Sequence, residues 1–334
     1  MDFVNCISIG ITKERCIRGT FSKSHCRDCE DICIVDAVVF SPEPSVNKNI
    51  CIKCSLCYSA CKFSAVNIKK DNKQLLKETK ENRQIDIGCI FSNSKIKITC
   101  LSRITEDLLI NWFKDAKTVT LKRGNCKSCK FKKTLRYFNE SFKKSVILAE
   151  AMSIKPDIKI KTEKSDSVYI PKESVSRRNM FSSLNITPPR SLPKRDILIK
   201  AISQPITNDT LYTDSAKITI DSSCTLCGVC SHICPVKAIT IVKDDSKGYI
   251  FFSPSLCINC KECEEACIYK SISVETQNIS SIVSKPKKVF EATKKVCTEC
   301  KKEFYSANEE EDTCHVCSAK EDSKQQFLNF LKNL

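Results

Sequence analysis

Four groups of cysteines in this chain have the spacing of metal ligands. They occupy residues 6–61, 89–129, 224–267 and 297–317, and together they contain all 25 cysteines. The N-terminus shows no export signal, and in a reducing compartment closely spaced cysteines bind metals more often than they form disulfides. One tryptophan and 7% aromatic residues are a poor supply for a large apolar core. Metal centres are therefore expected to replace part of that core.

The third group has a pattern specific for iron–sulfur clusters, because it contains two runs of the form Cys-x2-Cys-x2-Cys-x3-Cys. This block resembles the bacterial two-cluster ferredoxins, in which the last cysteine of each run binds the cluster of the other run. The resemblance implies a [4Fe–4S] cluster on Cys224, Cys227, Cys230 and Cys267. It implies a second [4Fe–4S] cluster on Cys257, Cys260, Cys263 and Cys234.

The first group repeats this pattern with one cysteine missing. Its complete run is Cys51, Cys54, Cys57 and Cys61. Its incomplete run is Cys26, Cys29 and Cys33, with Lys23 at the position of the first cysteine. Because loop closure costs little more as a loop lengthens, Cys16 can return to the vacant position.

Two further [4Fe–4S] clusters are therefore expected in the first group. One is expected on Cys16, Cys26, Cys29 and Cys61, and the other on Cys51, Cys54, Cys57 and Cys33. Cys6 as the missing ligand is one alternative, and a three-iron cluster without a fourth ligand is another.

The second group is embedded in a pattern of strand, helix and strand. Strands are expected at 96–99 and 118–121, with a helix between them whose apolar face is Leu108, Leu109, Trp112 and Phe113. The motifs C-L-x-R at 100–103 and G-x-C-x-x-C at 124–129 resemble the small iron–sulfur (delta) subunit of methyl-viologen-reducing hydrogenases, which works with heterodisulfide reductases. This resemblance implies a [2Fe–2S] cluster on Cys89, Cys100, Cys126 and Cys129. Structural zinc suits the same four ligands, and a redox-active dithiol at Cys126 and Cys129 is a further alternative.

Basic side chains surround the last two cysteines of this module. The segment 121–133 contains no acidic residue, and its basic residues are Lys122, Arg123, Lys127, Lys130, Lys132 and Lys133. Such a patch can dock an acidic redox partner, although a solvated basic loop explains it equally well. It lacks the interleaved aromatic residues that stack on single-stranded nucleic acid. The formal net charge of +16 also leaves out the negative charge of metal-bound thiolates, so it is weak support for nucleic-acid binding.

The fourth group resembles a zinc ribbon, with two Cys-x2-Cys pairs that are expected to bind one tetrahedral ion. Its ligands are Cys297, Cys300, Cys314 and Cys317. A closed site of four thiolates leaves no open position for catalysis, so a structural or docking role is expected. Iron in the same site, as in rubredoxin, is the redox alternative. The last residues, 322–334, are expected to form a short amphipathic helix.

The elements that position these cysteines are expected to be short. Brief strands at 7–11, 37–40, 65–68, 217–220, 238–242 and 271–274 flank the ferredoxin-like runs and make the first and third groups an internal repeat. The expected fold class is α+β, with two ferredoxin-like two-cluster units, a β-α-β cysteine module between them and a C-terminal zinc ribbon. The expected domains are 1–80, 86–155, a linker at 156–214, 215–280, 290–320 and the tail at 322–334.

The sequence offers metal ligands but no substrate site. It has no glycine-rich phosphate loop, no plausible nucleophile pair and no flavin or nicotinamide motif, so no independent catalysis is expected. We expect a cytoplasmic electron-transfer protein without a membrane span, whose partners are redox proteins such as a dehydrogenase, hydrogenase or heterodisulfide-reductase-like complex. The alternative is an iron–sulfur sensor or assembly protein that binds a partner or nucleic acid through its ribbon and basic patch.

Overall fold

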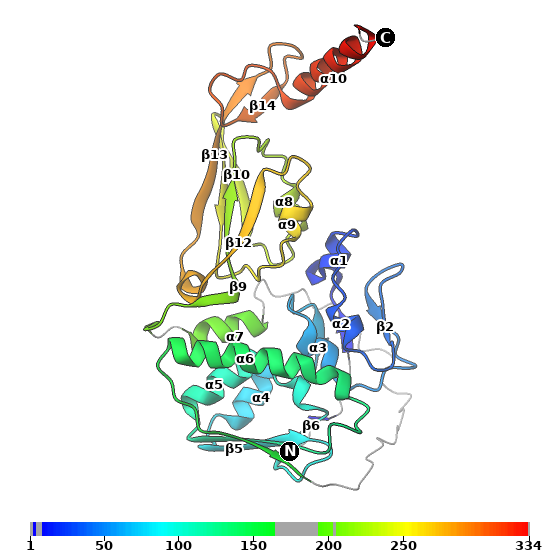
Figure 1. Ribbon diagram of the computed structural model, residues 1–334, viewed down its shortest axis with the longest axis vertical. Coiled ribbons are helices and arrows are strands. Elements are labelled where there is room, and N and C mark those ends of the chain that lie inside the picture. Colours follow the sequence, from blue (N-terminus) through cyan, green and yellow to red (C-terminus); the bar gives the residue numbers. More distant parts are fainter. Residues whose placement is uncertain (1–2, 5–8, 164–192, 203–204, 333–334) are drawn as a thin grey trace. The chain divides into compact units, whose positions relative to one another are not determined.

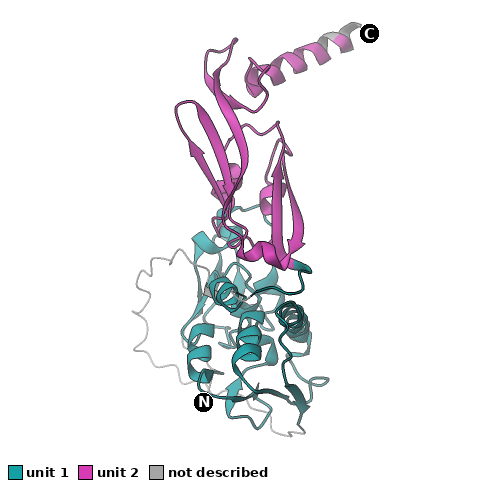
Figure 2. Cartoon of the chain, turned by 90° about the vertical axis from the view of Figure 1, so that its left-hand side faces the viewer, with its two compact units in different colours: residues 1–212 teal, residues 213–334 magenta. Residues whose placement is uncertain are grey.

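The fold is described by a computed structural model, in which residues 3–4, 9–163, 193–202 and 205–332 can be described. The chain divides into two compact units, Met1–Tyr212 and Thr213–Leu334 (Figure 2). Both units mix helices with several small sheets. Among the described residues, no helix combines the length and the apolar character that crossing a membrane requires.

The first unit begins with short elements around the cysteine loops. Its strands are β1 (Ile9–Ile11), β2 (Val38–Val39), β3 (Ser45–Val46), β4 (Val66–Ile68), β5 (Gln84–Cys89), β6 (Ile96–Ile98), β7 (Thr118–Arg123) and β8 (Ile158–Thr162). Its α-helices are α1 (Ile17–Thr20), α2 (Asp28–Asp31), α3 (Leu56–Ala60), α4 (Asn72–Thr79), α5 (Glu106–Asp115), α6 (Leu135–Ala151) and α7 (Pro193–Ala201). Short 3-10 helices are η1 (Lys13–Arg15), η2 (Leu101–Arg103) and η3 (Lys132–Thr134).

A four-stranded parallel sheet is the largest element of the first unit. Its strand order is β6-β5-β7-β8, and α4 to α7 lie on one side of it (Figure 1). Ile87, Ile98 and Leu121 of the sheet are fully buried, as are Leu108 and Leu109 of α5. Burying these aliphatic side chains gives the middle module an apolar core of its own.

Two small antiparallel pairs accompany the N-terminal cysteine loops. Strand β1 pairs with β4, with Ile9 opposite Ile68, and β2 pairs with β3, with Val38 opposite Val46. Such short pairs are marginal by themselves, so other contacts must stabilise them. The strands expected at 37–40 and 65–68 therefore occur, in shortened form, as β2 and β4.

The second unit consists of strands β9 to β14 with three α-helices and one 3-10 helix. Its strands are β9 (Leu211–Ile220, which starts at the end of the first unit), β10 (Ile239–Lys243), β11 (Lys247–Phe252), β12 (Ile272–Asn278), β13 (Lys287–Val296) and β14 (Glu303–Ser306). Its helices are α8 (Val229–Ile233), α9 (Glu262–Glu265), η5 (Ile279–Val283) and α10 (His315–Lys332). Strand β9 pairs with β12, and a four-stranded antiparallel sheet has the order β10-β11-β13-β14.

The long strand β13 pairs with two different strands of the second unit. Its first half pairs with β11, where Phe290 lies opposite Ile250, and its second half pairs with β14, where Lys295 lies opposite Phe304. The cysteine-rich C-terminus is therefore joined to the preceding domain by a continuous strand.

The structure differs from the sequence expectations in the middle of the chain. The β-α-β module has four strands, because β5 lies between β6 and β7 and β8 extends the sheet. The linker predicted for 156–214 contains β8 and α7, and α7 packs against α4 and α5; its residues 164–192 lie outside the described part. Strand β8 has few buried side chains and α7 a weak apolar pattern, which is why the sequence did not indicate them.

The expected C-terminal tail helix is longer than predicted. Helix α10 begins at His315, inside the fourth cysteine group, and continues to Lys332. The apolar face predicted for it lies outside the described side chains.

Candidate metal centres

Backbone conformation repeats at equivalent places in the cysteine runs. In the three complete runs, the residues two and four positions after the first cysteine have positive φ. These are Lys53 and Ser55, Leu226 and Gly228, and Asn259 and Lys261. Left-handed conformations are costly for residues other than glycine, so their recurrence indicates a required loop geometry.

The incomplete run lacks this loop geometry in its first half. The equivalent positions are His25 and Arg27, and neither has positive φ; that of Arg27 is −128°. In its second half the run matches the others, because Asp36, three residues after Cys33, has φ 50° like the equivalent residues of the complete runs. The run therefore departs from the repeat in the half where its cysteine is missing.

In the second unit, three cysteines of one run share a cavity with the last cysteine of the other. Cys224, Cys227 and Cys230 line it from one loop, and Cys267 lines it from the second run. Burial raises the pKa of Cys230 to about 11, and the charges of Cys224, Cys227 and Cys267 add to the shift. Four thiols are thus directed at one space, as a cubane cluster requires.

The remaining cysteines of this unit are also close to one another. Burial raises the pKa of Cys263, and further contributions come from Cys260, Cys257 and Cys234. Each of the two sets therefore combines three cysteines of one run with the last cysteine of the other.

The first unit brings its N-terminal cysteines together in a similar way. Burial is the main cause of the raised pKa of Cys16, Cys26 and Cys29, and the charge of Cys61 adds to each shift. Cys16 is itself buried, at the end of η1. The thiol of Cys61 is thus near enough for its charge to raise the pKa of Cys16, Cys26 and Cys29, whereas Cys6 lies outside the described residues.

The other four cysteines of the first unit form a second set. Burial raises the pKa of Cys54 to about 12, with Cys33 and Cys51 adding to the shift. Burial also raises the pKa of Cys57, to which Cys54, Cys51 and Cys33 contribute. Thiols whose ionisation is disfavoured in the metal-free protein lose their protons when metal binds, because the metal charge replaces the missing stabilisation.

Backbone amides point at the sulfur atoms of several cysteines. The amides of Ala37, Ala65 and Ala238 donate to the last cysteine of their runs, Cys33, Cys61 and Cys234, at 3.2, 3.3 and 3.4 Å. The amides of Lys53 and Asn259 donate to Cys51 and Cys257 at 3.4 Å. Such donors stabilise thiolate charge and tune an iron–sulfur cluster.

A lysine of α7 holds the end of the helix that precedes Cys61, and no pattern in the sequence predicted this contact. The Lys194 ammonium donates to the carbonyl oxygens of Tyr58, Ser59 and Cys61 at 2.7, 3.1 and 2.6 Å. These carbonyls end α3, where a cation stabilises the unpaired C=O groups and the helix dipole. Burial lowers the pKa of Lys194, while the negative charge of Cys61 opposes that shift.

Arg103, from the C-L-x-R motif, links the middle module to the N-terminal cysteines. It is buried, donates to Asn72 Oδ1 at 2.6 Å and lies over the Tyr58 ring at 4.6 Å. Its carbonyl accepts a hydrogen bond from the Ser59 hydroxyl at 3.2 Å. This motif residue thus has an internal structural role next to α3.

The middle group surrounds a cavity at the carboxyl end of the parallel sheet. All four cysteines line it, together with Phe91, Leu101, Gly124 and Phe131 among others. Cys89 ends β5, and the other three follow β6 and β7, so the four meet at one edge as expected. The amides of Gly124 and Phe131 donate to Cys89 and Cys129 at 3.3 and 3.4 Å.

The basic patch beside this cavity is partly neutralised within the unit. Lys122 pairs with Asp86 at 2.9 Å and with Glu163 at 3.7 Å, and the Arg123 side chain donates to Thr162 at 3.1 Å. Four lysines remain exposed at the surface: Lys127, Lys130, Lys132 and Lys133. Asp86 and Glu163, which are distant in the sequence, thus neutralise part of the positive charge predicted for this patch.

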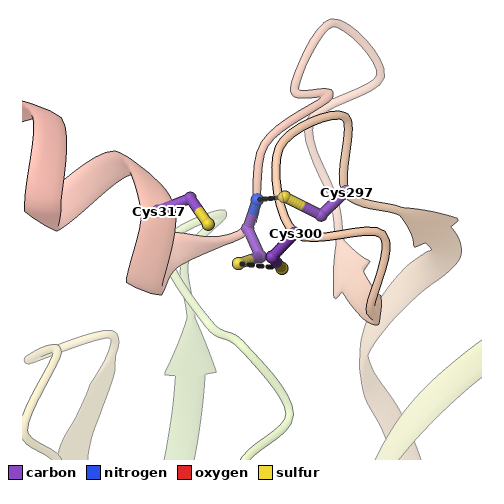
Figure 3. Close-up of side chains that lie close together, drawn as sticks. Cys297, Cys300 and Cys317 are labelled. Carbon is purple, nitrogen blue, oxygen red and sulfur yellow. Dashed lines mark hydrogen bonds between the residues drawn. The ribbon is translucent and has the colours of Figure 1, made fainter.

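The C-terminal cysteines have a tighter arrangement than the other groups. The sulfur atoms of Cys297, Cys300, Cys314 and Cys317 all lie within 4.8 Å of one another (Figure 3). The Cys300 and Cys314 sulfurs are 3.8 Å apart. Within the described residues, no other group of three or more candidate ligands is this compact.

Hydrogen bonds favour thiolate at one position of this site. The amide of Cys314 donates to the Cys297 sulfur at 3.2 Å, and this bond, with one from Cys300, lowers the pKa of Cys297 to about 6. Hydrogen bonding with Cys314, followed by burial, raises the pKa of Cys317 to about 12. The buried Phe304 of β14 packs beside them. The four thiols form a group that could hold one metal ion.

Comparison with known proteins identifies one part of the chain. No curated protein matched the chain. A family model described as a 4Fe-4S dicluster domain matches residues 223–271, which contain both complete cysteine runs of the second unit. This part of the chain is therefore a ferredoxin-type iron–sulfur domain.

Proposed function

We propose that this chain is an iron–sulfur electron-transfer protein that relays single electrons between redox proteins through four [4Fe–4S] clusters. It would act as a polyferredoxin-type carrier or as a subunit of a redox enzyme complex. The observation that carries this proposal is the dicluster domain at 223–271, in which two cysteine runs jointly line one cavity. A bound [4Fe–4S] cluster accepts and donates one electron at a time, at a potential set by its surroundings.

The repeated loop conformation supports a second ferredoxin-like unit at the N-terminus. Left-handed residues recur at the same places around Cys51 and Cys61 as around the cysteines of the dicluster domain. Cys16 fits the role of the missing ligand, because the negative charge of Cys61 contributes to the raised pKa of the Cys16 thiol. Backbone amides donate to Cys61 of one set and to Cys33 and Cys51 of the other, as donors that tune a cluster would.

The sulfur spacing in the middle module favours a [2Fe–2S] cluster over zinc. A single zinc ion with Zn–S bonds of about 2.3 Å would bring four sulfurs to within about 3.8 Å of one another. The four C-terminal sulfurs lie within 4.8 Å of one another, close to that spacing, and there we propose zinc; the middle cysteines do not form so compact a group. The four exposed lysines beside the middle cavity are the proposed docking surface for an acidic redox partner.

Metal analysis of anaerobically purified protein, combined with EPR after reduction, tests this function. We expect about 18 iron atoms and one zinc per chain, and low-potential signals from most of the clusters. About 8 iron atoms with two or more zinc would contradict the proposal, because only the dicluster domain would then carry clusters. A sensor or scaffold role would become the better explanation.

A further inference from the structure

One position distinguishes the fourth cysteine run from the other three. The residue four positions after the last cysteine is alanine in three runs, at Ala37, Ala65 and Ala238. Each alanine offers only its amide to the cysteine sulfur. In the fourth run the equivalent residue is Ser271, which also carries a hydroxyl.

The Ser271 hydroxyl lies between two thiols of one cavity. Its oxygen is 3.3 Å from the Cys267 sulfur, and it also forms a hydrogen bond that stabilises the Cys224 thiolate. Ser271 is 4% exposed, so water does not compete freely for these contacts. Because a metal-bound thiolate can only accept, the hydroxyl must donate in the loaded protein. None of the three alanines can provide this donor.

We propose that Ser271 raises the reduction potential of the cluster on Cys224, Cys227, Cys230 and Cys267 above that of its neighbour in the dicluster domain. This inference rests on the proposed function. A reduced cluster carries one more negative charge than an oxidised one, so an added hydrogen-bond donor stabilises the reduced form more. Ser271 is thus a positioning and tuning residue that binds no iron itself.

The exposure of Cys227 acts in the same direction. It is exposed, whereas the four cysteines of the neighbouring set, Cys234, Cys257, Cys260 and Cys263, are half-buried. Solvent near a cluster also stabilises its more negative, reduced form. Electrons that enter this domain therefore collect on the Ser271 cluster and leave it near Cys227.

Replacement of Ser271 by alanine in the full-length protein tests the inference. Alanine occupies this position in the other three runs, so we expect Ser271→Ala to fold and to keep its iron and sulfide. In an EPR-monitored redox titration, one component equivalent to one electron per chain should move to lower potential. The expected change is up to about tenfold in the ratio of reduced to oxidised cluster, which for one electron is about 59 mV.

Two further variants make the result specific. Ser231→Ala removes a hydroxyl beside Cys230 that donates to the Ile239 carbonyl at 2.9 Å, so it should leave all potentials unchanged. The reciprocal change, Ala238→Ser, adds a hydroxyl at the equivalent place and should raise the potential of the neighbouring cluster.

The possible outcomes separate this inference from the proposed function. Unchanged potentials in Ser271→Ala with full iron content would overturn the tuning role and leave the electron-transfer proposal intact. If Ser271→Ala loses iron, the Ala238→Ser variant decides instead. An unchanged potential of the neighbouring cluster in that variant would likewise overturn the tuning role and leave the electron-transfer proposal intact. Failure of the unaltered protein to contain reducible clusters would instead contradict the proposed function.

Discussion

At the scale of single residues, two cations beside α3 are a main feature of the first unit. Lys194 is fixed by three carbonyl oxygens at the end of α3, and Arg103 lies over the Tyr58 ring in the same region. Both cations lie close to the cysteine run at 51–61, where the proposed clusters would add negative charge. There they would stabilise the loops that carry the ligands and the charge of the metal-bound thiolates.

The identity of the fourth ligand of the first cluster can be tested by removing one thiol at a time. We expect Cys16→Ser to lower the iron content by between about one and four atoms per chain, according to whether a three-iron cluster or none remains. Metal analysis and EPR of the oxidised protein distinguish these two results. Cys6→Ser is the matched control and should keep its full iron content. The opposite result in the two variants would identify Cys6 as the ligand.

At the scale of secondary structure, α7 joins two parts of the first unit that lie far apart in the sequence. It packs against α4 and α5 of the middle module, and its Lys194 reaches α3 of the cysteine-rich block. The two parts are thereby fastened to each other, so the loss of one contact should weaken both.

Removal of the Lys194 ammonium should destabilise this junction. We expect Lys194→Met to lower the urea midpoint at which cluster absorbance is lost, because each buried carbonyl without a donor costs about 1–3 kcal/mol. Lys200→Met, on an exposed position of the same helix, should change the midpoint little. Equal midpoints for the two variants would contradict the junction role of Lys194.

The backbone at Gly124 passes close to Phe91, in the loop that follows β5, and this close approach requires glycine at position 124. A Cβ atom there would lie 2.6 Å from Phe91 Cβ and 3.2 Å from the Phe91 carbonyl oxygen, while the Gly124 amide donates to Cys89. We expect Gly124→Ala to shift this loop and reduce metal retention at the middle site, measured by metal content and visible circular dichroism. Gly10→Ala is the control, since no atom lies within 4 Å of its added Cβ. Full metal retention in Gly124→Ala would show that the loop tolerates the contact.

At the scale of the whole molecule, the different metals are proposed for separate parts of the chain. The compact C-terminal site is attached to the dicluster domain through β13, whereas the middle cavity lies in the other unit. Loss of the C-terminal metal should therefore leave the iron centres in place.

A zinc chelator should remove one metal ion from the protein without releasing iron. The pairing of β13 with β14 should then open, because the ion connects the loop before β14 to the start of α10. Hydrogen exchange at 297–317 measures this opening, and EPR measures the remaining clusters. Cys317→Ser should contain no chelatable zinc. Zinc that persists in this variant would place the ion in the middle module.

The geometry of each cysteine loop could be predicted because it depends on residues that are close together in the sequence. Spacings of two and three residues dictate tight loops, and these loops recur in the structure with the same left-handed positions. The strands expected after the last cysteine of each run also occur, as β2, β4, β10 and β12, since their apolar residues follow directly after that cysteine. Local sequence therefore determined where ligands are presented and which elements flank them.

Only the tertiary structure decided which distant groups meet. Lys194 is 133 residues from Cys61, and Lys122 is neutralised by Asp86 and Glu163 from other strands. The approach of Cys267 and Ser271 to Cys224 likewise depends on how two runs pack together. Such contacts arise from burial and charge compensation between segments, and no spacing within one segment encodes them.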